Sequence, residues 1–228
     1  MRRVFLLFGL LPLFAISSCW EGTTRSICAT VLSEQGEVFF VDAGTTNSHT
    51  LNSKSKLCPG SVLRTAADAK INLQLIPGAV AQISSDSELK IEDLSLTKDG
   101  NETGEAIRER RAQLELRRGK MIVLFEGFAH FEIRTRDATI AVLPSCLFQL
   151  DVNQSRTRVT CVRGKLYATS RDGQKASIDG GYFREWPSKQ ASVSTSQDNQ
   201  AQIDITTTLQ AGRELVDLAA ARRDQLPF

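Results

Sequence analysis

The chain has 228 residues, of which 28 are lysine or arginine and 26 are aspartate or glutamate. Two of the arginines lie in an N-terminal stretch without acidic residues, so the rest of the chain carries 26 charges of each sign. This balance excludes general electrostatic attraction to nucleic acid or to an anionic surface, and we expect no nucleic-acid partner. The length suits one domain with a substantial core, with room for a tail.

The N-terminus has the pattern of an export signal. Two arginines precede an apolar run, Val4–Ile16, which is too short to span a bilayer comfortably and is followed by small residues. We therefore assign residues 1–18 to a signal peptide and leave them out of the fold. The sequence Ile-Ser-Ser-Cys that ends at Cys19 resembles the lipobox of bacterial lipoproteins, in which the cysteine is acylated after cleavage. An ordinary secretory signal, cut just before this cysteine, is the alternative.

Acylation of Cys19 would anchor the protein to a membrane, because each buried methylene of an acyl chain adds roughly 0.8 kcal/mol. Trp20 follows in place of the aspartate that retains many enterobacterial lipoproteins in the inner membrane. We therefore predict an exported protein of the cell envelope, anchored by lipid in the outer membrane and facing the periplasm. We expect no transmembrane span after the signal.

The chain after the signal divides into three parts. Residues 19–56 are a lipid-anchored N-terminal segment that could include the first strands of the domain, and 43–56 is rich in Ser, Thr and Asn, typical of a loop or linker. From 57 to 187, short runs alternate apolar and polar residues between turn signals, as in Ile71–Leu75. This part is predicted to be an all-β domain, an antiparallel two-sheet sandwich.

Residues 188–228 are predicted to form a polar linker and a short C-terminal helix. The stretch up to about residue 202 has almost no apolar side chain, so we expect it to stay unordered and the tail to be removable. Leu215, Leu218 and Ala219 would form a narrow stripe that rests on the domain or on a partner. Arg-Gly-Lys followed by a large apolar residue occurs at 118–121 and at 163–166, which indicates one strand–turn–strand unit used twice.

Taken in order, these β segments resemble a FecR-type domain over about 125 residues. The Gly-x-x-Leu-x-Thr start of that family matches Gly60, Leu63 and Thr65. One departure is the turn before the aromatic strand, where Pro144–Cys146 replaces the Gly-Thr of the family, so a function placed on that turn is not expected here. The later hairpins of the family match 71–83, 114–123, 131–138, 147–168 and 176–183.

The resemblance implies a protein–protein recognition module that faces the periplasm. Named members of the family are inner-membrane regulators with a cytoplasmic anti-sigma segment and a membrane helix, neither of which we expect in this chain. We therefore predict a non-catalytic, lipid-anchored module of the cell envelope with a protein partner. The alternatives are a structural lipoprotein that binds glycan or peptidoglycan, and a component of FecR-like cell-surface signalling.

No residue pattern points to catalysis, to a cofactor or to a metal ion. His49 and His130 have no distinctive setting for a catalytic base, and we interpret both as surface residues. The cysteine spacing is not that of a zinc site, and no glycine-rich phosphate loop opens a helix. The segment 180–186 concentrates three aromatic residues, which we interpret as core residues that close the domain, or alternatively as exposed binding anchors: Tyr182, Phe183 and Trp186.

Four cysteines remain once Cys19 is acylated, and an oxidising compartment favours their pairing. A two-residue turn at 153–154 would place Cys146 opposite Cys161, within reach of a disulfide after a small adjustment. Cys28 and Cys58 would then form a second disulfide. A longer turn would place Cys161 opposite Phe148 instead. Two reduced core cysteines are the main alternative for the hairpin pair, and metal or redox chemistry is a minor one.

Overall fold

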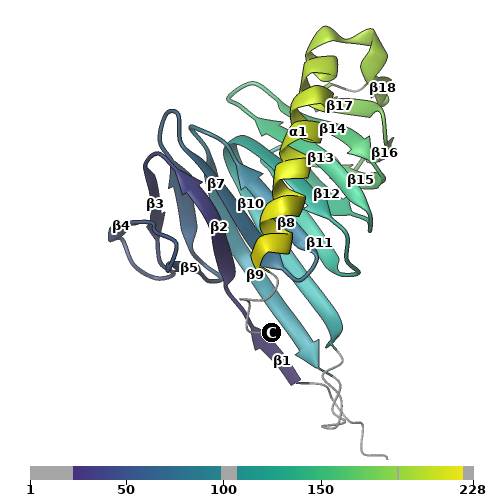
Figure 1. Ribbon diagram of the computed structural model, residues 1–228. Helices are drawn as coiled ribbons and strands as arrows, with labels where there is room; N and C mark the ends of the chain where they lie inside the picture. Colours follow the sequence, from purple (N-terminus) through teal and green to yellow (C-terminus); the bar gives the residue numbers. More distant parts are fainter. Residues whose placement is uncertain (1–22, 99–106, 189, 223–228) are drawn as a thin grey trace, which may run out of the picture.

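The computed structural model describes residues 23–98, 107–188 and 190–222, and this part of the chain is mostly β-strand. Figure 1 shows two layers of strands with one long helix lying across the outer side of one layer. The all-β, two-sheet prediction is confirmed. We call the layer under the helix the covered sheet and the other layer the exposed sheet.

The exposed sheet contains, in spatial order, β4 (Ser48–Thr50), β3 (Val38–Val41), β6 (Val62–Thr65), β9 (Glu88–Lys98), the first part of β10 (Ile107–Phe125), β11 (His130–Arg134), β12 (Ala138–Val142), β15 (Lys165–Ser170) and β16 (Lys175–Asp179). The short strand β1 (Thr23–Ser26) pairs with the far end of β9. The covered sheet contains β5 (Lys56–Leu57), β2 (Ala29–Gln35), β7 (Lys70–Ile76), β8 (Ala79–Ile83), the second part of β10, β13 (Cys146–Val152), β14 (Thr157–Arg163), β17 (Tyr182–Trp186) and β18 (Val193–Ser194).

The long strand β10 belongs to both sheets, so strand pairing runs from one layer into the other. Its residues up to Arg118 pair with β9, and those from Gly119 onward pair with β13. The pairing of β10 with β11 is parallel, whereas the other pairs of described strands are antiparallel. The predicted antiparallel sandwich therefore has one parallel pair at its centre.

The repeated Arg-Gly-Lys sequence marks the two corners where the chain changes sheets. At Gly119 strand β10 leaves the exposed sheet, and at Gly164 the chain passes from β14 in the covered sheet to β15 in the exposed sheet. Both glycines have positive φ, +94° and +88°. A Cβ at Gly119 would lie 2.1 Å from Oγ of Ser87, and one at Gly164 would lie 2.5 Å from Sγ of Cys146. Only glycine fits such a corner without a shift of its neighbours.

The two sheets differ in burial because the helix covers only one of them. Strands of the exposed sheet alternate buried and accessible residues, as β12 does, and the buried set faces the core between the sheets. Strands of the covered sheet are buried on both faces: all five residues of β8 are buried, and so are six of the seven in β13. Burial on both faces explains why β8 and β13 are apolar at most positions.

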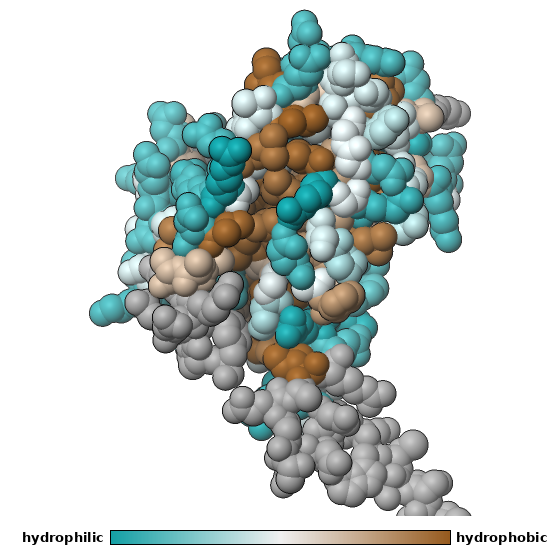
Figure 2. All heavy atoms as spheres, turned by 45° about the vertical axis from the view of Figure 1, so that its right-hand side comes forward, coloured by the Kyte–Doolittle hydropathy of each residue, from teal (hydrophilic) through white to brown (hydrophobic). Residues whose placement is uncertain are grey.

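The helix α1 (Asn199–Arg222) follows a single turn of 3₁₀ helix, η1 (Thr195–Gln197), and lies against β14, β10, β13, β8 and β2. Its side chains Ala211 and Leu215 join a second apolar cluster with Leu32, Ile122 and Leu147 on the outer face of the covered sheet. Figure 2 shows apolar residues gathered beside the otherwise polar helix. The predicted terminal helix is thus present and packs on the domain, one of the two expected positions, but it is longer than expected.

The N-terminal segment contains the first strands of the domain, the option that the sequence left open, and the C-terminal tail is ordered earlier than expected. Strands β2 and β3 pair with β7 and β6, so the sandwich begins well before residue 57. At the other end, β18, η1 and the first turn of α1 fall within the stretch that was expected to be unordered up to residue 202. The reason is tertiary packing: the polar tail is ordered by contacts with the covered sheet rather than by its own apolar content. None of the described helices is long and apolar enough to cross a membrane.

Candidate interaction site

The three aromatic residues of β17 have different environments. Phe183 and Trp186 are buried, and Trp186 belongs to the core between the sheets. Tyr182 is 43% exposed and lies at the edge formed by β17 and β18. Phe183 and Trp186 are therefore packing residues, while Tyr182 remains available as a contact residue.

The outer face of β17 contributes to a buried charge cluster that holds the start of α1. The Arg158 guanidinium lies 4.3 Å from the centre of the Phe183 ring and pairs with Glu185 at 3.0 Å and with Asp198 at 2.5 Å. Asp204 of the helix lies 3.6 Å from Nε of Arg158. Such a buried cation is tolerated because several carboxylates compensate it.

Asp198 also caps the helix. Its Oδ1 accepts a hydrogen bond of 2.7 Å from the backbone N–H of Ala201, and this bond satisfies one of the free donors at the helix start. That bond, together with the Arg158 guanidinium, lowers the pKa of the Asp198 carboxyl from its usual value. One carboxylate thus fixes both the beginning of α1 and its position on the covered sheet.

The inner face of β17 carries a second buried arginine, Arg184, which lies between Tyr182 and Trp186 in the alternation of the strand. Its guanidinium lies 5.5 Å from the centre of the Trp186 ring. A cleft of about 330 Å³ opens at this place, lined by Arg184 and Tyr182 from one sheet and by Ser177 and Asp179 of β16 from the other. This cleft, at the ends of both sheets, is the candidate interaction site.

The structure contains one of the two predicted disulfides. Cys28, just before β2, and Cys58, just after β5, are joined with an S–S distance of 1.94 Å. The bond connects residues 30 positions apart and joins β2 to its neighbour β5 at the edge of the covered sheet. It lies away from the candidate interaction site, so its role is structural.

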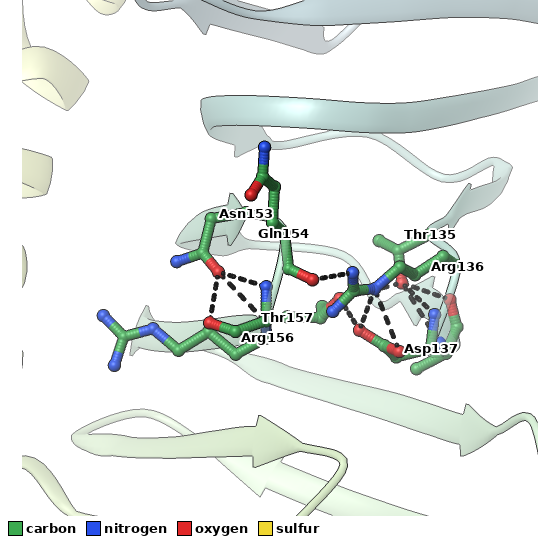
Figure 3. A network of polar contacts seen from close by, with 9 residues as sticks. Thr135, Arg136, Asp137, Asn153, Gln154, Arg156 and Thr157 are labelled. Carbon is green, nitrogen blue, oxygen red and sulfur yellow. Dashed lines mark hydrogen bonds and ion pairs between the residues drawn. The ribbon is translucent and has the colours of Figure 1, made fainter.

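Cys146 and Cys161 are free in the structure, and the register predicted for them is wrong. The loop between β13 and β14 has four residues, 153–156, so Val152 pairs with Thr157 and Cys161 pairs with Phe148. Figure 3 shows why the loop is longer: Oδ1 of Asn153 accepts hydrogen bonds from the backbone N–H groups of Ser155 and Arg156.

A neighbouring turn holds the same loop in place. Oγ1 of Thr157 donates to Asp137 at 2.6 Å, and Arg136 donates to the backbone carbonyl of Gln154 (Figure 3). These contacts join the β13–β14 loop to the turn between β11 and β12. A two-residue turn would forgo them, which is the physical reason for the longer loop and for the different register of the cysteines.

Both free thiols are buried and poorly suited to chemistry. Burial raises the pKa of the Cys161 thiol to about 12, with the nearby Cys146 adding to the effect. Burial also raises the pKa of Cys146, whose sulfur accepts a hydrogen bond from the backbone N–H of Lys165 at 3.2 Å. Thiols held in the protonated form are weak nucleophiles and weak metal ligands.

The histidines lie far apart in the exposed sheet. His49 is on β4 and His130 is on β11, with β3, β6, β9 and β10 between them in strand order. His130 lies 3.4 Å from Glu132 at the surface. Among the described residues, no group of three or more His, Cys, Asp or Glu side chains could hold a metal ion. Cys19, the predicted lipidation site, lies outside the described residues.

Two residues that could contact a partner were not predicted from the sequence. Arg184 lies within the aromatic segment already singled out, and its position in the alternation, between Tyr182 and Trp186, was the signal that it faces inward. Phe128, in the loop between β10 and β11, is the most exposed large apolar residue among those described. Only the loop geometry shows this exposure, since its neighbours in sequence are also apolar or small.

Part of the chain matches a known protein family. Residues 61–167 match the family model described as FecR protein, so the predicted resemblance to a FecR-type domain is confirmed over that segment. The matched segment contains strands from β6 to β15 and ends before β17 and the candidate interaction site.

Solved structures include a similar chain. Two crystal structures of a protein from Parabacteroides distasonis ATCC 8503, proposed to be an anti-sigma factor, match with TM-scores of 0.43 and 0.42 at 13% sequence identity. Each match covers 58% of this chain and 59% of the solved chain, so it spans less than two thirds of that protein. No curated protein matches the chain.

Proposed function

We propose that this protein is a non-catalytic module of the cell envelope, anchored by lipid at Cys19, that recognises another protein. The observation that carries the proposal is the FecR-type match of residues 61–167. It favours a signalling setting, in which the partner is a component of FecR-like cell-surface signalling. The cleft beside Tyr182 supplies a place for recognition, since it combines an accessible aromatic ring with charged groups.

The position of β1 determines which end of the molecule an anchor at Cys19 would hold. This strand begins at Thr23, four residues after Cys19, and four residues of chain span at most about 14 Å. An acylated Cys19 would therefore hold the β1–β9 end of the molecule close to the membrane. In Figure 1 this end lies opposite β17 and β18, so the candidate interaction site would face away from the membrane.

Photo-crosslinking in intact cells tests the recognition function. A photoreactive phenylalanine analogue replaces Tyr182, and the control carries it at Tyr167, which is 48% exposed on β15. We expect the Tyr182 position to crosslink to a distinct envelope protein and the Tyr167 position not to do so. Crosslinking to glycan strands would support the peptidoglycan-binding alternative, and equal labelling from both positions would contradict a specific surface at this edge.

The anchor has its own test. Cells grown with a labelled fatty acid should incorporate the label into the wild-type protein, and Cys19→Ala should abolish incorporation and release soluble or unprocessed protein. Fractionation of the membranes then shows whether the protein resides in the outer membrane, as we propose. An unlabelled wild-type protein would leave an ordinary secretory signal as the explanation of the N-terminus.

A further inference from the structure

Among the described residues, Arg184 is a buried cation without a carboxylate partner. It is 8% exposed, and its Nε is buried without a hydrogen-bond partner. Within the part of the chain that the structure describes, no carboxylate lies within 4.0 Å of its guanidinium nitrogens. Burying a charge is costly unless it is paired, so an uncompensated guanidinium in a folded domain calls for a physical explanation.

A comparison with Arg158 shows how unusual this environment is. The two arginines lie on neighbouring strands of the same sheet, and both are buried. Arg158 has three carboxylates around it, whereas the contact shown by Arg184 is with the ring of Trp186. A cation over an aromatic face gains some stabilisation, but Nε of Arg184 has neither a hydrogen-bond partner nor, unlike Nε of Arg158, a carboxylate within 4.0 Å among the described residues. The described residues thus neutralise the charge of Arg158 but provide no carboxylate for Arg184.

Arg184 is one of the residues that line the cleft between β16 and β17. The acidic group in its lining, Asp179, is already paired with Lys165 at 3.1 Å and accepts a hydrogen bond from Ser177 at 3.3 Å. Its carboxylate forms no ion pair with Arg184 within 4.0 Å. The remaining lining is small or uncharged, with Tyr182 as the accessible aromatic ring. A group that enters the cleft would meet Arg184 and the ring of Tyr182 in its lining.

We propose that this cleft binds a carboxylate of an acidic peptide segment in the partner protein, with Arg184 as the carboxylate receptor. This inference rests on the proposed function and names the chemistry of recognition. A guanidinium takes a carboxylate through two parallel hydrogen bonds, a geometry that lysine cannot provide. Tyr182 packs against the apolar part of the same segment. The carboxylate comes from a glutamate or aspartate side chain or from a C-terminus, since both present the same group.

Titration with short peptides tests the carboxylate. The probes are acetyl-Ala-Glu-Ala-amide, its glutamine counterpart, and acetyl-Ala-Ala-Ala with a free C-terminus, each added to the ¹⁵N-labelled full-length protein. The chain has two tryptophans, and we expect the indole signal of Trp186 to move while that of Trp20 stays. The glutamate peptide should bind about tenfold more tightly than the glutamine peptide, because a hydrogen bond to a charged group is lost in the latter.

Variants locate the receptor. Arg184→Met should abolish the difference between the glutamate and glutamine peptides, and Arg184→Lys should reduce it while the charge is kept. Arg171→Met, which removes an exposed arginine in the turn between β15 and β16, is the matched control and should bind as the wild type does. If Arg184→Met fails to fold, the Arg184→Lys result decides.

Several outcomes would overturn the inference. One is equal binding of the glutamate and glutamine peptides, and another is unchanged peptide binding by Arg184→Lys. A third is a shift of the Trp186 signal with sulfate that equals the shift with the glutamate peptide, which would mean an adventitious ion only. Binding of soluble peptidoglycan fragments in preference to the peptides would also contradict it. The proposed function is tested separately. If the Tyr182 position still crosslinks to an envelope protein in Arg184→Met, protein recognition is supported and the role of Arg184 as carboxylate receptor is contradicted.

Discussion

Leu215 is where the contribution of the C-terminal helix to stability can be measured. Its side chain is 0% exposed and packs in the apolar cluster between α1 and the covered sheet. The next residue, Val216, is 51% exposed on the same helix and serves as the matched control. Leu215→Ala and Val216→Ala both shorten an aliphatic side chain at neighbouring positions, and the gain in helix propensity from either change is at most about 0.7 kcal/mol, which is small beside the loss of buried packing.

The expected effects differ severalfold. Truncation of a fully buried leucine to alanine costs about 3 kcal/mol, since transfer and cavity terms add. In a domain of this size each kcal/mol lowers Tm by roughly 2–4 °C, so Leu215→Ala should lower Tm by about 6–12 °C. Val216→Ala should change the free energy of unfolding by about 0.5 kcal/mol or less.

Urea unfolding of both variants, followed by circular dichroism, provides the measurement. We expect the urea midpoint to fall for Leu215→Ala and to stay near the wild-type value for Val216→Ala. A chain that ends at residue 187 should be destabilised more than Leu215→Ala, because it uncovers the whole outer face of the covered sheet. Equal stability of the two point variants would refute the packing of α1 as described.

Three further predictions follow from single residues. Gly119→Ala should destabilise the protein by several kcal/mol because its Cβ would meet Ser87, whereas Gly173→Ala, with similar φ but open space, should cost about 1–2 kcal/mol in thermal unfolding. The lowered pKa of Asp198 means that its stabilisation is present above its unfolded pKa of about 4 and is lost as the pH falls through the folded pKa. Asp198→Ala should therefore cost about 1 kcal/mol at pH 7, and its unfolding curve should converge with that of the wild type towards pH 2. Cys161 should resist alkylation by iodoacetamide in the native protein at pH 8 and react fully in urea, because burial raises its pKa; rapid native labelling would contradict this.

The residue pattern of the β region was sufficient to predict its class. Strict alternation in Ile71–Leu75 and Ala112–Leu116 corresponds to strands β7 and β10, and the order of such segments pointed to the FecR-type domain. The disulfide between Cys28 and Cys58 is also the second disulfide that the sequence predicted. Local patterns succeed here because side-chain alternation depends only on strand geometry and on one buried face.

The register of the cysteine hairpin could not be predicted, because loop length depends on contacts outside the hairpin. Asn153 closes its own turn, but Arg136 and Asp137 of another turn hold the loop and its first strand residue. A change of two residues in the loop moves Cys161 from Cys146 to Phe148. Register follows from the whole set of contacts around a strand pair, whereas the sequence offers only the turn signals.

By itself, the sequence determined the alternating strands, the Arg-Gly-Lys corners as a repeated unit, and the concentration of aromatic residues in β17. Only the tertiary structure decided which of these residues are buried, because burial depends on what covers each sheet face. The polar tail becomes ordered since α1 covers apolar side chains of the covered sheet that lie far away in sequence. In the same way Arg158 is compensated by carboxylates of β17, of the segment before the helix and of the helix itself. Arg184 lies on the other face of β17, where the packing of the described parts of the two sheets brings no carboxylate within 4.0 Å of it.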